Sequence, residues 1–199
     1  RGATRGPGAL KLFHGNGDGT FAQSAETDLP FAPVCLASGD LNGDTFPDAV
    51  VAVENQDDWP PAYELHIAIN DGTGALALGG MISLPFQPVE IRIGDLDGAN
   101  GPDIVASATE IEYNEGMPVR GHLCVALNQG AAVFPAEFTC QATGMEIAGG
   151  LALGDMDENG TLDAVVGTGW NGEGGLLLGI FPGLGNGVFG GPQWTFLGT

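Results

Sequence analysis

The chain has 199 residues, enough for one domain with a substantial core. Its 25 acidic and 5 basic residues give a net charge of −20, which disfavours binding to nucleic acid or to anionic lipid. No apolar run approaches the roughly 18 residues of a membrane span, so we expect no insertion into a membrane.

Glycine is unusually frequent, with 35 residues in a chain that is 43% hydrophobic. This combination is typical of many tight turns between short strands, and the apolar content argues against disorder. No sustained helical spacing of apolar residues is found. We therefore expect an all-β fold.

An acidic ten-residue motif occurs three times, at a period of 55 to 60 residues. Its copies are residues 39–48 (GDLNGDTFPD), 94–103 (GDLDGANGPD) and 154–163 (GDMDENGTLD). Short apolar runs flank each copy and predict strands buried on both faces. The runs before the motif are residues 34–37, 89–93 and 151–153, and those after it are 49–53, 104–106 and 164–166.

A glycine-rich turn alternates with the acidic motif. Asn-Gly and Asp-Gly pairs between apolar runs favour β-hairpins because the turn needs positive φ. Strands are expected before the turn, and the last Phe or Leu of each turn is expected to open the next strand. The copies are residues 15–21 (GNGDGTF), 70–76 (NDGTGAL), 128–134 (NQGAAVF) and 183–189 (GLGNGVF).

Each period therefore holds four strands, which is typical of a β-propeller blade. We expect one propeller region over residues 1–199, with about three and a half antiparallel blades. Such a set does not close a ring, so we expect part of a larger propeller or closure by pairing with another chain. In chain order the elements are a half-blade at 8–30 and blades at 31–85, 88–142 and 146–199.

Oxygen-bearing groups alternate along each acidic loop, at positions 1, 3, 5, 7 and 9, where position 1 is the first Asp. Alternating oxygen donors on a tight loop suit calcium, which takes 6–8 oxygen ligands. The second loop has Ala99 at position 5, so we expect a weaker site there. The predicted ligands are Asp40, Asn42, Asp44, the Phe46 carbonyl and Asp48; Asp95, Asp97, the Gly101 carbonyl and Asp103; and Asp155, Asp157, Asn159, the Thr161 carbonyl and Asp163.

These alternating motifs resemble the FG-GAP/VCBS repeats of integrin-α-like β-propellers, over essentially the whole chain. The resemblance implies a propeller with calcium in the loop that joins the first two strands of each blade. It also implies a secreted or cell-surface protein. The family is functionally broad and includes adhesion receptors and lectins.

The segments between the second and third strands of each blade are long and variable, and loops of this kind often carry function. Each has one large aromatic residue beside amide and carboxylate groups: Trp59, Tyr113 and Trp170. Such a set suits a sugar, because a ring covers its apolar face and polar groups bond its hydroxyls. Packing between blades is the alternative role for these aromatics.

No motif of a nucleophile with a base is found, so we expect a protein that is not an enzyme. The leading hypothesis is a calcium-stabilised extracellular module that contacts a protein partner or its own copies. A carbohydrate-binding lectin is the alternative.

The three cysteines are Cys35, Cys124 and Cys140. Cys124 and Cys140 lie in two runs that we pair as a hairpin. A disulfide between them and a pair of buried thiols are both compatible with the sequence.

Overall fold

The computed structural model describes residues 7–57, 59–112, 117–145, 148–168 and 177–196. This described part contains fourteen strands and no helix, which confirms the all-β prediction. It accordingly has no helix long and apolar enough to cross a membrane.

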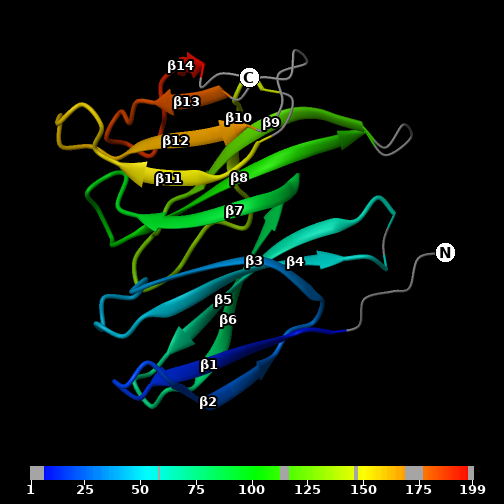
Figure 1. The fold of residues 1–199 in the computed structure, drawn as a ribbon, viewed down its shortest axis with the longest axis vertical. Helices are drawn as coiled ribbons and strands as arrows, with labels where there is room; N and C mark the ends of the chain where they lie inside the picture. Colours follow the sequence, from blue (N-terminus) through cyan, green and yellow to red (C-terminus); the bar gives the residue numbers. More distant parts are fainter. Residues whose placement is uncertain (1–6, 58, 113–116, 146–147, 169–176, 197–199) are drawn as a thin grey trace.

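The strands form four separate antiparallel sheets in which chain neighbours pair (Figure 1). A two-stranded sheet contains β1 (Ala9–Gly15) and β2 (Phe21–Asp28). The first four-stranded sheet contains β3 (Ala32–Gly39), β4 (Asp48–Asn55), β5 (Ala62–Asn70) and β6 (Leu76–Leu84). The second contains β7 (Gln87–Gly94), β8 (Asp103–Glu112), β9 (Met117–Ala126) and β10 (Thr139–Ala142). The third contains β11 (Leu151–Gly154), β12 (Asp163–Thr168), β13 (Leu177–Phe181) and β14 (Gln193–Phe196).

The sheets lie one above another, in chain order from bottom to top of Figure 1. Within the described residues they form no closed ring. The four-stranded sheets are consistent with propeller blades.

The second strand of a sheet supplies side chains to two neighbouring interfaces. Val50 and Ala52 of β4 belong to the core between the first and second sheets, whereas Val51 and Val53 pack toward the β1–β2 side. In β8, Ile104 lies in the former core, and Val105 belongs to the core shared with the third sheet. Alternate residues of a strand point to opposite faces, so a sandwiched strand is apolar throughout.

The first strands are less buried than the sequence predicts. In β3, Cys35 and Ala37 pack against the core, but Val34 and Leu36 are 40% and 56% exposed. The expectation of burial on both faces is therefore wrong for β3. One face of β3 contacts β7 of the next sheet, whereas Val34 and Leu36 lie on the face that is not covered.

The last strands of the second and third sheets begin later than predicted. Phe134 and Phe189 were expected to open them, but β10 begins at Thr139 and β14 at Gln193. Proline follows both phenylalanines, at Pro135 and Pro192, and proline has no N–H for a sheet ladder. After Pro135 the chain instead reaches the neighbouring sheet, where Ser83 N donates to Ala136 O at 2.9 Å.

Candidate metal sites in the acidic loops

The three acidic loops occupy equivalent turns of the three four-stranded sheets. They join β3 to β4, β7 to β8 and β11 to β12, and they lie on the left side of Figure 1. The β4–β5 connection lies on the opposite side. The repeat therefore places its acidic groups at one end of the molecule.

The aspartate at position 9 is the first residue of the second strand and is buried in every copy. Asp48, Asp103 and Asp163 are 1%, 0% and 2% exposed. One carboxylate oxygen accepts the N–H of the residue after the position-1 aspartate. These donors are Leu41, Leu96 and Met156, at 2.9, 2.8 and 2.7 Å.

The other oxygen of each position-9 aspartate reaches the glycine-rich hairpin of the same sheet. It accepts the backbone N–H of Asn70, Asn128 or Gly183, at 2.9, 2.8 and 2.8 Å respectively. Sequence reasoning missed this role of the hairpins, which were interpreted only as turns. The regular recurrence of a hairpin after each acidic loop was the available signal, because it keeps both segments at the same end of the sheet.

The position-1 aspartate organises the loop that follows it. The Asp40 carboxylate accepts backbone N–H groups from Gly43, Asp44 and Thr45 at 2.8, 3.2 and 2.8 Å. Asp155 likewise accepts from Asn159 and Gly160 at 3.0 and 2.8 Å. These bonds wrap the backbone around the carboxylate.

Two of the loops bring three carboxylates together. Asp95, Asp97 and Asp103 each offer an oxygen within 4.8 Å of the other two, and so do Asp155, Asp157 and Asp163. Either cluster could hold a metal ion. The second loop forms its cluster although Ala99 offers no side-chain ligand at position 5, and only its backbone N–H is used, as a donor to Asp97.

The first loop is arranged differently. Its carboxylates, from Asp40, Asp44 and Asp48, do not form such a cluster. An amide stands at position 3, and Asn42 Nδ2 donates to Asp44 Oδ2 at 2.9 Å while Asn42 Oδ1 accepts the Asp44 N–H at 2.9 Å. The third loop has its amide at position 5, where Asn159 Oδ1 accepts the Thr161 N–H at 2.8 Å.

The electrostatics of the second cluster favour a bound cation. Burial is the main reason that the pKa of Asp103 is raised above its ordinary value. The two N–H groups that it accepts act in the opposite direction, and the charges of Asp97 and Asp95 raise the pKa further. A cation would offset both the burial and the repulsion between like charges. The all-oxygen donor set fits a hard cation.

At the opposite end, the structure describes one of the three aromatic residues that were predicted to contact a ligand. Trp59 is 78% exposed, whereas Tyr113 and Trp170 lie outside the described residues. The residues that follow Trp59 in the chain line a groove of about 250 Å³ between the first and second sheets. Its lining includes Pro60, Pro61, Tyr63, Pro85, Phe86 and Glu110.

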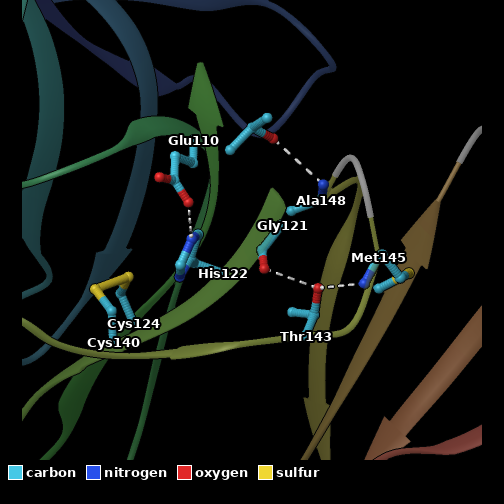
Figure 2. Close-up of polar contacts among 9 residues, drawn as sticks. Glu110, Gly121, His122, Cys124, Cys140, Thr143, Met145 and Ala148 are labelled. Carbon is cyan, nitrogen blue, oxygen red and sulfur yellow. Dashed lines mark hydrogen bonds and ion pairs between the residues drawn. A yellow bond between two sulfur atoms is a disulfide. The ribbon is translucent and has the colours of Figure 1, made fainter. Parts of the chain in front are cut away.

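Glu110 also pairs with a buried histidine behind this groove (Figure 2). His122 Nε2 lies 3.1 Å from Glu110 Oε2, and its ring stacks on Phe86 with centroids 3.8 Å apart. His122 therefore holds two side chains that line the groove, Glu110 and Phe86, in place.

The structure also shows which cysteines are paired. Cys124 and Cys140 face each other across β9 and β10 and form a disulfide (Figure 2). Cys35 remains a free thiol, and burial, with a smaller contribution from the charge of Glu90, raises its pKa to about 11. A thiol with such a pKa is largely protonated at neutral pH and therefore unreactive.

The fold and the acidic loops define an all-β repeat protein built of four-stranded antiparallel sheets. Residues 3–51 match the family model of the FG-GAP-like repeat, a segment that includes the first glycine-rich turn and the first acidic loop. The chain thus contains an FG-GAP-like repeat, as the motifs indicate. A comparison with curated proteins found no match.

Proposed function

We propose that the chain is a calcium-stabilised binding module, built as blades of a β-propeller and secreted or displayed at the cell surface. The observation that carries the proposal is the carboxylate clustering in the acidic loops, within 4.8 Å in the second and third. Calcium suits clustered carboxylates, amides and backbone carbonyls on a tight loop. The disulfide supports an oxidising compartment.

Calcium in this account has a structural role. Each position-9 aspartate joins an acidic loop to a glycine-rich hairpin, so an ion on that carboxylate would hold both turns of a sheet together. The opposite end is left for contacts with a partner. We propose a protein partner or further copies of the chain, without catalysis.

The test is thermal unfolding in millimolar calcium, in magnesium and in EDTA. At free calcium of about 1 mM and a Kd of about 0.1–1 mM, each occupied loop contributes roughly 0.4–1.4 kcal/mol. Three loops would then raise Tm by roughly 2–15 °C for a chain of this length. Magnesium should do less, because it demands a stricter octahedral geometry. Equal melting in calcium and EDTA would contradict the proposal.

The surface around Trp59 favours a lectin as the second candidate function. The Trp59 indole is 78% exposed, and the next two residues, Pro60 and Pro61, line a groove together with two aromatic rings and a carboxylate. A ring face and polar groups in one place are what a sugar needs.

A glycan-array screen in calcium distinguishes the two candidates. Saturable binding that Trp59→Ala abolishes, with unchanged melting, would support the lectin. No binding by folded protein would favour the protein-partner role, and light scattering would then separate self-assembly from a 20.2 kDa monomer.

A further inference from the structure

We propose that Asn128 couples the first and second acidic loops, so that calcium binding at one loop strengthens binding at the other. The inference rests on the proposed calcium function and assigns a regulatory role to a residue of the neighbouring hairpin. It is carried by an unbroken series of buried hydrogen bonds between Asp48 and Asp103.

The series begins in the first loop. The Leu41 N–H donates to Asp48 Oδ2 at 2.9 Å, and the Leu41 carbonyl accepts Nδ2 of Asn128 from the next sheet at 2.8 Å. It ends in the second loop, where the Asn128 N–H donates to Asp103 Oδ1 at 2.8 Å. All four residues are at most 2% exposed, so water does not compete for these bonds.

Asn128 is held on both sides. Its Nδ2 also donates to the Pro102 carbonyl at 3.1 Å, next to Asp103, and its Oδ1 accepts the Gly130 N–H at 2.9 Å. A cation that orders the Leu41 segment would therefore also order Asn128 and the carboxylate that it supports. A second cation would then find that carboxylate already positioned, which is positive cooperativity.

The third sheet provides an internal contrast. Its equivalent hairpin residue is Gly183, which has no side-chain amide, and a Cβ at that position would overlap the Leu162 carbonyl. Among the described residues, no hydrogen bond joins the second acidic loop to the third. The hydrogen-bonded coupling should therefore join the first and second loops only, although the second and third loops line one pocket of about 210 Å³.

Asn70 is the matched control residue. It occupies the same hairpin position in the first sheet, but its side chain donates to Pro47 O of its own acidic loop, at 3.2 Å. Truncation of Asn70 removes an equivalent amide without removing a bond between loops.

The experiment is calcium calorimetry on variants that isolate the loops. Asp157→Ala disables the third loop in every protein, and Asp40→Ala disables the first. The affinity of the second loop should fall about fivefold or more when the first loop is disabled, the lower range of measured couplings. This difference should disappear with Asn128→Ala and persist with Asn70→Ala.

Hydrogen exchange tests the proposal without altering Asn128, in case its truncation prevents folding. In the Asp40→Ala/Asp157→Ala protein only the second loop can bind. Calcium should nevertheless slow amide exchange in residues 41–48, across the Asn128 bond. Calcium binding without this protection, or second-loop affinity indifferent to Asp40→Ala, would overturn the coupling alone. The absence of calcium binding in the unsubstituted protein would overturn the proposed function as well.

Discussion

The position-9 aspartates have a structural role in addition to the metal-binding role proposed for them. Asp48, Asp103 and Asp163 are proposed metal ligands, yet each is buried and accepts backbone N–H groups from two segments of the chain. The other acidic residues of the loops are more exposed. Replacement of a position-9 aspartate should therefore affect folding even in the absence of calcium.

We predict that Asp103→Ala destabilises the protein in EDTA by about 2–5 kcal/mol, because it leaves two buried N–H donors without an acceptor. Asp97→Ala should cost less than about 1 kcal/mol under the same conditions, since it removes one partly exposed acceptor. Urea unfolding of both variants measures the difference. Equal losses for the two would show that the hydrogen bonds of Asp103 do not stabilise the fold.

Sequence reasoning could place the aspartates but not all of their partners. The acidic positions are visible because the motif repeats with fixed internal spacing. The amide of Asn128 contacts Leu41, which is 87 residues away, and this contact depends on how two sheets pack. Repetition within the sequence carries no direct information about such a pair.

At the scale of strands, the sequence predicts the second strands best. β4 and β8 each lie between two neighbouring sheets and are buried on both faces. Their sequences therefore contain unbroken apolar runs. Edge strands are harder to predict, because one face or one side lacks a neighbour. Val34 and Leu36 of β3 remain exposed, and β10 and β14 begin after prolines that interrupt the ladder.

The disulfide stabilises the hairpin formed by β9 and β10. Cys124 and Cys140 are separated by 16 residues, and cross-linking a loop of that size is worth about 3 kcal/mol in the chain-entropy model. We predict that reduction lowers the free energy of unfolding by about 2–4 kcal/mol. Urea unfolding with and without a reductant tests this, with Cys124→Ala/Cys140→Ala as the comparison.

Cys35→Ser is the control for that experiment. This variant retains the disulfide, so it should keep the full sensitivity to reductant. An unfolding midpoint that reductant does not change would show that the disulfide contributes nothing to stability.

At the scale of the whole molecule, apolar clusters lie between neighbouring sheets and each acidic loop lies at one end. The net charge of −20 is thus partly concentrated where cations are proposed to bind. Bound calcium would reduce the repulsion among these groups as well as hold the turns. The repeat predicts the four-stranded units from sequence, and the described sheets form no closed ring.

The most direct test of this account is the number of calcium ions bound per chain, measured by calorimetry or equilibrium dialysis. The account predicts saturable binding of one ion per acidic loop, with Kd values of about 0.1–1 mM. Asp40→Ala, Asp97→Ala and Asp157→Ala should each remove one ion. Binding that is unsaturable, or that these substitutions leave unchanged, would contradict the assignment of calcium to the acidic loops.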